Sequence, residues 1–418
     1  MLFFAAVVYL SVIYIRPSDI VPALAGIPIV DGLTVVSMLI TVATLVLRQR
    51  RPSVSAMDAW VFVFWGAIVI SNAAWGWLGG ALRGFLDFAP VVFFYVLVRT
   101  AVDTPQRVRR FVAVFVLLNL LLAINGIVEY RTGLGLGDVR PVGLENRIRG
   151  TGIFNDPNDL GMTLVMSVPL AAWAVFDRTQ PFWRRALAML ILAPILAAIV
   201  YTNSRGAVLG MCAVAMVFAL RQFKVIPALA FGAAAVSALI VLGPARAQAI
   251  DSQENSAQSR IEAWGQGLMM LRSKPVFGVG YSRFTEYHRK VAHNSFVQTA
   301  AELGLLGAVV LVAMLDTMFR IFARARKAVE LSPGLPPAYV NGLIASAVGM
   351  LVCAFFLSRQ YVVVPYVLLA LAGSLDGLVP ASSHGMLPPF ILPMARAVAL
   401  TMVTLGTVYT MVLTMGAW

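Results

Sequence analysis

Residues 111–130 of the chain read FVAVFVLLNLLLAINGIVEY, an apolar run whose only charge is Glu129. A helix needs about 20 predominantly apolar residues to cross the hydrocarbon core of a bilayer. The run is therefore predicted to be a membrane-spanning helix.

Similar apolar runs lie on both sides of this one along the chain. They fall near residues 1–15, 29–47, 57–75, 84–98, 160–176, 186–203, 206–220, 225–243, 296–319, 337–357, 361–379 and 390–414. Short runs near the start, or the proline-rich stretch 380–393, could be re-entrant or interfacial instead. The sequence predicts an all-α, polytopic helical membrane bundle, with about 12 (11–13) transmembrane helices in a single transmembrane domain over residues 1–418.

The composition excludes most other classes of protein. Of 418 residues, 60% are hydrophobic and 12% are charged, about half the charged share of a soluble protein, and the mean hydropathy is +0.85. A soluble enzyme, a secreted disulfide scaffold, a fibrous protein and a disordered chain are excluded, and the long runs exclude an outer-membrane barrel. Cys212 and Cys353 lie in apolar runs, so we expect neither a disulfide nor a redox role.

The net charge of +13 comes almost entirely from arginine. Four explanations compete: a nucleic acid partner, orientation in the membrane, an anionic ligand, and an arginine-rich genome composition without functional meaning. No soluble domain exists to carry a basic face, so no nucleic acid partner is expected.

Short basic connections predict the orientation of the chain. They are Arg48–Arg51, Arg99–Arg110, Arg178–Arg185, Arg221–Lys224 and Arg320–Lys327, and counting the runs puts all of them on one side. Short cytoplasmic loops are enriched in Lys and Arg, so this side and the N-terminus are predicted to be cytoplasmic. The two longer loops, 131–158 and the larger 244–294, then lie on the opposite, outer face of the membrane.

Both outer loops are basic, although orientation does not require it. Their cations are Arg131, Arg140, Arg147, Arg149, Arg246, Arg260, Arg272, Lys274, Arg283, Arg289 and Lys290. Positive charge on this face opposes the positive-inside rule, so these residues predict an anionic partner there.

The larger loop contains an amphipathic helix. Ser259-Arg260-Ile261-Glu262 has the form of a capping box, which predicts a helix start. An apolar stripe at helical spacing follows, made of Ile261, Trp264, Leu268 and Leu271. Lys274-Pro275 should end the helix. Arg260 in the first turn is either an anion ligand or an anchor to lipid phosphates.

His293 precedes the next apolar run, which Ser295 and Gln298 are predicted to open as a second capping box. A histidine at the outer mouth of a membrane helix is either a catalytic base or an ordinary interfacial residue. Glu302 lies about two turns into the run, and a carboxylate at that depth predicts a cationic partner.

Thr202-Asn203-Ser204-Arg205-Gly206 separates two apolar runs by a tight connection at the outer face. Arg205 carries a planar guanidinium suited to phosphate, and snorkelling to lipid headgroups is the alternative.

Asn155-Asp156-Pro157-Asn158-Asp159 closes the smaller loop. Asn155 or Asp156 is predicted to cap a helix with Pro157 at its first position. A site formed by Asp156 and Asp159 is the alternative. No D-x-D motif stands on the outer face, so no metal site and no cofactor are predicted.

These motifs, in this order, resemble the O-antigen ligase and Wzy-type polymerase superfamily of bacterial membrane glycosyltransferases. The resemblance covers about residues 195–320: Thr202–Gly206, Arg260 with Trp264, Gly278–Gly280, and His293-Asn294. The segment from Arg149 to Asn158 is similar to a more variable upstream motif, which adds Arg149, Asn155, Asp156 and Asn158 as candidate substrate-binding residues with Trp264 and Asn294.

The resemblance implies a metal-independent, inverting transfer on the periplasmic side. The donor would be a glycan on undecaprenyl pyrophosphate, and the acceptor a hydroxyl of lipid A–core in a ligase or of another glycan in a polymerase. It also implies that Arg205 and Arg260 bind the pyrophosphate and that His293 is the base. A secondary anion transporter is the runner-up, since hydropathy alone cannot separate the two classes.

Overall fold

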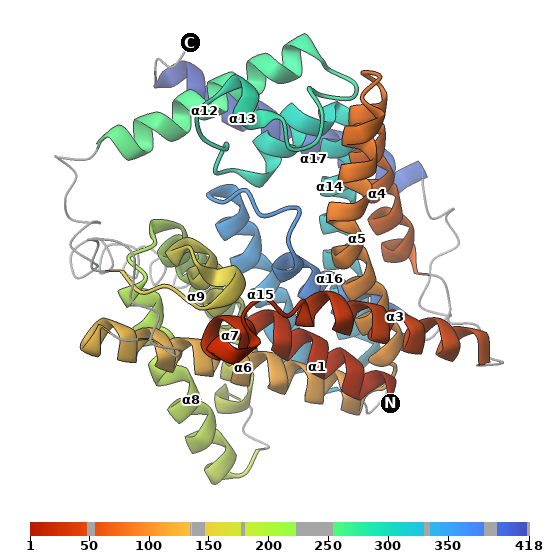
Figure 1. The fold of residues 1–418 in the computed structure, drawn as a ribbon. Helices are drawn as coiled ribbons and strands as arrows, with labels where there is room; N and C mark the ends of the chain where they lie inside the picture. Colours follow the sequence, from red (N-terminus) through yellow and green to blue (C-terminus); the bar gives the residue numbers. More distant parts are fainter. Residues whose placement is uncertain are drawn as a thin grey trace. The chain divides into compact units, whose positions relative to one another are not determined.

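The computed structural model describes residues 1–47, 55–133, 135, 147–176, 180–222, 254–329, 335–379 and 391–415. The predicted run 225–243, Arg140, Arg246 and most of the stretch 380–393 lie outside these residues. All secondary structure in the described residues is helical (Figure 1).

The polytopic all-α fold is confirmed. Ten described helices are long and apolar enough to cross a membrane, and the two shorter apolar helices Arg205–Leu220 and Val363–Asp376 add to them. Every predicted apolar run that falls within the described residues is a helix.

The chain forms two compact units. The first comprises Met1–Arg51, Thr100–Ile250 and Arg326–Cys353, and the second comprises Pro52–Arg99, Asp251–Ala325 and Ala354–Trp418.

The first unit is built around α7. Its described elements are α1 (Leu2–Ile15), α2 (Pro17–Ile20), η1 (Pro22–Leu24), α3 (Ile29–Leu47), α6 (Pro105–Thr132), η2 (Gly152–Phe154), α7 (Pro157–Phe176), α8 (Phe182–Tyr201), α9 (Arg205–Gln222) and most of α15 (Pro337–Phe355). Residues 159–172 of α7 are all buried, and α6, α8 and α9 pack against this helix. Small residues permit the close packing: a Cβ on Gly161 would lie 2.8 Å from that of Ala207 on α9.

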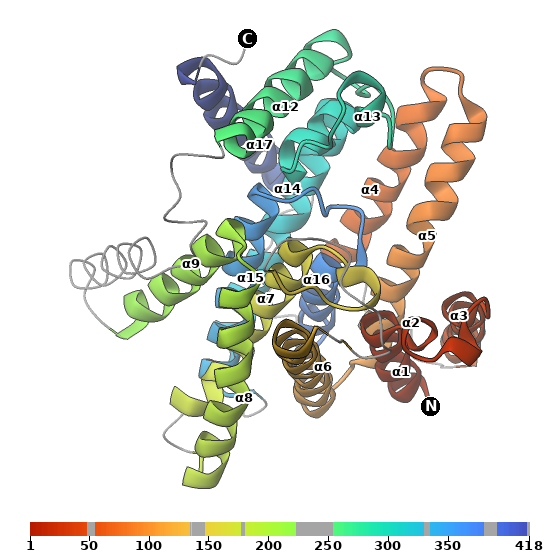
Figure 2. The ribbon, with the colours of Figure 1, turned by 60° about the vertical axis from the view of Figure 1, so that its left-hand side comes forward.

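The second unit has α16 as its most buried helix. Its described elements are α4 (Ala56–Ala73), most of α5 (Leu78–Ala101), α12 (Glu254–Ser273), α13 (Phe284–Tyr287), most of α14 (Ser295–Val329), α16 (Val363–Asp376) and α17 (Ile391–Thr414). Figures 1 and 2 both show α4 and α5 side by side and α12 beside α17. Every residue of α16 from Val364 to Asp376 is buried.

Two boundary predictions are wrong. The basic segment Arg320–Lys327 is not a connection, because α14 continues through it to Val329. Asp316 forms an ion pair with Arg320, one turn later, and Arg324 pairs with Asp376 of α16, so carboxylates neutralise two cations of the extended helix. The amphipathic helix α12 begins at Glu254, before the predicted capping box at Ser259.

Candidate functional site

A polar cluster in the first unit surrounds the tight turn between α8 and α9. Asn158 on the first turn of α7 accepts hydrogen bonds at Oδ1 from Ser204 Oγ at 2.8 Å and from Arg147 Nη2 at 3.2 Å. Arg147 Nε donates to the Thr202 carbonyl oxygen at 2.9 Å. The cluster thus fixes the turn that presents Arg205.

Arg205 is the first residue of α9, and its side chain is exposed. Ser204 Oγ accepts a hydrogen bond from the Ala207 N–H at 3.3 Å, which makes Ser204 the N-cap. Asn203 before it has a left-handed φ of 50°, a conformation that asparagine tolerates better than most residues. The guanidinium therefore extends from the start of a helix, where the positive end of the helix dipole also favours anions.

The capping interpretation of the 155–159 segment is confirmed for Asp156. Its Oδ1 accepts from the Asn158 N–H at 2.7 Å and from the Asn158 amide at 2.8 Å, with Pro157 at the first helical position. Asn155 is exposed, and Arg149 is half-buried within electrostatic reach of Glu129.

In the second unit, α12 contacts the segment that carries His293. Trp264 is buried, and its indole Nε1 donates a 2.9 Å hydrogen bond to the carbonyl oxygen of Ala292. Its ring also packs edge-on against Phe355. Arg260 lies four residues before Trp264, so both project from the same face of α12, the face that contacts residue 292.

His293 and Asn294 form the entry to α14. His293 has a left-handed φ of 48°, a strained conformation that is enriched at functional sites. Asn294 Oδ1 accepts from the N–H groups of Phe296 at 2.9 Å and Val297 at 3.1 Å, so Asn294 is the N-cap. Its Nδ2 is buried and has no hydrogen-bond partner among the described residues.

The predicted capping box of Ser295 and Gln298 is therefore wrong, because the cap lies one residue earlier. Ser295 instead bonds to the segment that joins α15 and α16. Its Oγ donates to the Leu357 carbonyl at 2.6 Å and accepts from the Arg359 N–H at 3.1 Å.

Arg359 is a residue of this region that the sequence analysis missed. Ser358 Oγ accepts from the Asn294 N–H at 3.2 Å, so the 357–359 segment runs directly beside His293 and Asn294. The sequence did contain a signal for a functional arginine, because Arg359 lies between two apolar runs, as Arg205 does. Arg147 was counted among the cations of the smaller loop but was not predicted to belong to the site.

The Gly278–Gly280 turn crosses α14 where this helix is broken. Gly304 has φ 67° and ψ −166° inside α14. The carbonyl oxygens of Ala301 and Glu302 accept from the N–H groups of Val279 and Gly280, both at 2.9 Å, and the N–H groups of Leu305 and Leu306 donate to Pro275 and Val276. In a continuous helix these four groups would pair with one another, so the turn replaces two helical hydrogen bonds.

Glu302 lies at this break with its side chain almost fully buried. Its Oε1 accepts from the Phe284 N–H at 3.3 Å and from Gln298 Nε2 at 3.1 Å, and the Tyr361 hydroxyl lies beside the carboxyl group. All these partners are uncharged. The prediction that Glu302 has a cationic partner is therefore wrong for the described residues. Glu302 instead anchors the loop through Phe284.

A tyrosine and an arginine of the same loop have shifted pKa values. Burial, with smaller contributions from Asp87 and Glu302, raises the pKa of Tyr281 to about 12. A hydrogen bond to Glu286 raises the pKa of Arg283, which also lies over the Trp77 ring. Both groups therefore keep their protons at neutral pH.

Within the described ranges, no three His, Cys, Asp or Glu side chains are grouped closely enough to hold a metal ion. Cationic and neutral donors instead mark both regions: Arg147, Arg149 and Arg205 in the first unit, and Arg260, His293, Asn294 and Arg359 in the second. Such groups suit an anion and a proton transfer.

Fold and site together define a polytopic all-α membrane protein with arginine- and histidine-bearing helix ends. A sequence model of the family described as O-antigen ligase matches residues 187–312, so this part of the chain is similar to that family. The match runs from α8 into α14 and includes Arg205, Arg260, Trp264, His293 and Asn294; the motif from Arg149 to Asn158 lies outside it. No curated protein matches the chain.

Proposed function

We propose that the protein is a membrane glycosyltransferase of the O-antigen ligase type. It moves a glycan from undecaprenyl pyrophosphate to a hydroxyl of lipid A–core at the periplasmic face of the bacterial inner membrane. The observation that carries the proposal is the match over residues 187–312, which contains all three residues of the expected chemistry.

The reaction is a direct displacement. His293 takes the proton of the acceptor hydroxyl, and the oxygen attacks the anomeric carbon of the donor sugar. The bond from this carbon to the pyrophosphate oxygen breaks, and the lipid pyrophosphate leaves with the bonding electrons. One displacement inverts the anomeric configuration, and arginines can neutralise the leaving group without a metal.

Each candidate residue has a role in this scheme. Arg205 and Arg260 bind the pyrophosphate, and Arg359, whose backbone N–H bonds to Ser295 at the start of α14, adds a third guanidinium. Asn294 Nδ2 donates to substrate, which accounts for a buried donor that has no partner among the described residues.

Other candidates hold these residues in position. Asp156 and Asn158 fix the turn before Arg205, while Arg149 and Asn155 flank the donor. Trp264 holds α12 against Ala292. The loops 131–158 and 244–294 are the periplasmic segments of the scheme.

A Wzy-type polymerase of the same family is the second candidate, since both reactions use the same donor. A deletion strain separates the two. Loss of a ligase leaves lipid-linked polymer but none on lipid A–core, whereas loss of a polymerase leaves core capped by a single repeat.

Transfer by the purified protein in detergent, without any membrane gradient, supports an enzyme. A secondary anion transporter would show none. In the same assay, His293→Ala must lose activity if the proposed chemistry is right.

A further inference from the structure

A pocket of about 470 Å³ lies in the first unit between α6, α7, α8 and the start of α15. This volume falls in the range of roughly 300–1,000 Å³ that is typical of small-molecule sites. The pocket lies where α6, α8 and α15 begin and α7 ends. This is the end of the helices that carries Arg107, Arg109, Arg110, Arg184 and Arg185, away from the turn that presents Arg205.

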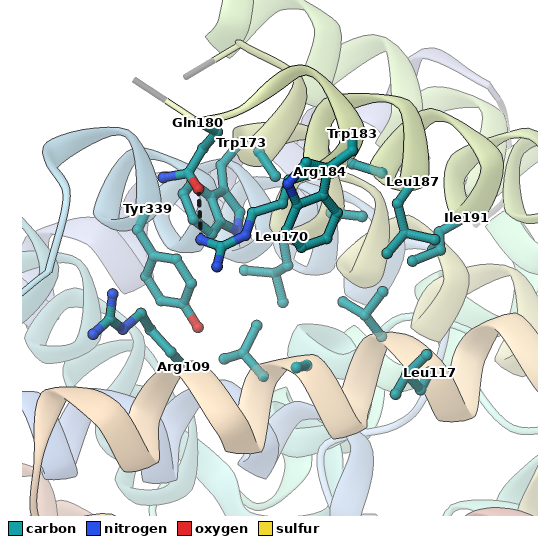
Figure 3. A pocket seen from close by; sticks show the side chains of 16 residues that line it. Arg109, Leu117, Leu170, Trp173, Gln180, Trp183, Arg184, Leu187, Ile191 and Tyr339 are labelled. Atoms are coloured by element: carbon teal, nitrogen blue, oxygen red, sulfur yellow. Dashed lines mark hydrogen bonds between the residues drawn. The ribbon is translucent and has the colours of Figure 1, made fainter. Parts of the chain in front are cut away.

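One end of the pocket is polar and cationic. Figure 3 shows Arg109 beside Tyr339 at this end, with Arg184 and Gln180 above them. Both arginines are exposed. Arg184 makes two contacts with uncharged side chains of the described residues. Its Nη1 donates a 3.2 Å hydrogen bond to Gln180 Oε1, and its guanidinium lies 5.0 Å from the centre of the Trp183 ring.

The rest of the pocket is apolar. Leu117, Leu187 and Ile191 line the end opposite Arg109 (Figure 3), and Trp173 and Leu170 line its wall. None of the sixteen described lining residues is acidic. From Arg109 to Leu117 the groove follows α6 for about 12 Å, taking a rise of about 1.5 Å per residue.

This arrangement selects an amphiphile with an anionic head. A free inorganic anion would use the arginines but leave the apolar groove empty, and a neutral lipid would leave both guanidinium groups without a countercharge. Basic pockets between membrane helices are typical sites for anionic headgroups, and tryptophans such as Trp183 prefer the membrane interface.

We propose that this pocket binds an anionic phospholipid, with the headgroup phosphate between Arg109 and Arg184 and an acyl chain along the groove towards Leu117 and Ile191. None of the lining residues belongs to the residues proposed for the transfer, and the test requires neither glycan donor nor acceptor.

The test is native mass spectrometry of the purified full-length protein, titrated with phosphatidylglycerol and, in parallel, with phosphatidylcholine of the same chain length. We expect the wild type to retain phosphatidylglycerol preferentially. An arginine near anionic lipid contributes about fivefold in affinity, so Arg109→Gln/Arg184→Gln should bind roughly 25-fold more weakly. The control Arg110→Gln/Lys327→Gln removes the same charge from exposed residues outside the pocket and should bind as the wild type does.

A second variant tests the groove while keeping both arginines. Ala113 is exposed and lines the pocket, so Ala113→Trp should fold and fill it, and phosphatidylglycerol binding should fall as in the double arginine variant. Equal retention of the two lipids by the wild type, equal losses in the pocket and control arginine variants, or undiminished binding by Ala113→Trp would overturn the proposal. Complete displacement of the lipid by inorganic phosphate, or a preference for a polyprenyl phosphate over phosphatidylglycerol, would also overturn it.

Discussion

The indole of Trp264 donates a 2.9 Å hydrogen bond to the carbonyl oxygen of Ala292, the residue directly before His293. Arg260 projects from the same face of α12, so this bond couples the position of an arginine to that of the histidine. Trp264 is buried, which suits a residue that positions others.

Trp264→Phe keeps most of the ring and removes the hydrogen bond. Because such a bond contributes about 1 kcal/mol, we expect kcat to fall roughly two- to tenfold while donor affinity stays unchanged. Trp65→Phe is the control, since its indole also donates to a backbone carbonyl, that of Phe85. Equal effects of the two substitutions would show that Trp264 has no special link to catalysis.

Replacing the arginines by lysine tests the proposed pyrophosphate contacts. A guanidinium can form two parallel hydrogen bonds with phosphate, while an ammonium is a point charge. Arg205→Lys, Arg260→Lys and Arg359→Lys should each lose about a hundred- to thousandfold in rate and should bind undecaprenyl pyrophosphate more weakly. Arg272→Lys is the control, because Arg272 is an exposed residue near the end of α12. Unchanged lipid binding by all three variants would remove this role.

His293→Ala should behave differently from the arginine variants. Removal of a general base costs roughly 10²–10⁴-fold in rate, but the pyrophosphate contacts remain. Donor binding should therefore persist while transfer is lost. His288→Ala is the matched control, since His288 lies in the same loop and its Nδ1 bonds only to backbone groups of Lys290. Full activity of His293→Ala would exclude the proposed mechanism.

Gly304→Ala should destabilise the second unit. A Cβ on Gly304 would lie 2.3 Å from the Val276 carbonyl oxygen, and its φ of 67° disfavours any side chain. Strain and overpacking together predict a loss of about 2–6 kcal/mol, visible as a lower melting temperature in detergent. Gly66→Ala is the control, because nothing lies within 4 Å of its Cβ position. A wild-type melting temperature for Gly304→Ala would contradict the close crossing.

Cysteine labelling tests the predicted orientation. Thr285 and Lys327 are exposed, and the native Cys212 and Cys353 are buried, so their background reactivity should be low. In cells with a permeabilised outer membrane, an impermeant thiol reagent should modify Thr285→Cys but not Lys327→Cys. The reverse pattern would place the His293 segment in the cytoplasm and exclude a periplasmic transfer.

Hydropathy was sufficient to predict the helices, because a span is a local property of about 20 residues. The ends of the helices were harder to predict. The acidic partners of Arg320 and Arg324 include Asp376, far along the chain, so the extension of α14 could not be predicted locally. Asn294 and Ser295 are both good N-caps, and only the contacts of Ser295 with residues 357–359 decide between them.

The sequence motifs singled out Arg205, Arg260 and His293, with Asn158, Trp264 and Asn294 beside them, but not Arg147 or Arg359. Arg359 is more than sixty residues after His293, and nothing in the intervening sequence indicates that the two segments meet. Gly304 gave no signal either, because glycines are common in membrane helices. Its break depends on backbone groups that the loop at 275–280 supplies.

That substitution of loop backbone for helix backbone has a consequence for biosynthesis. Residues 275–280 leave the ribosome before α14, so the groups that complete this helix are made before the helix itself. Without the loop, α14 could keep its break at Gly304 only with four backbone groups unpaired, each at a cost of several kcal/mol. It would otherwise close into a continuous helix in which these groups pair with one another. The broken form of α14 therefore requires the loop, and a cut between them should yield a helix without the break even though every residue of α14 is retained.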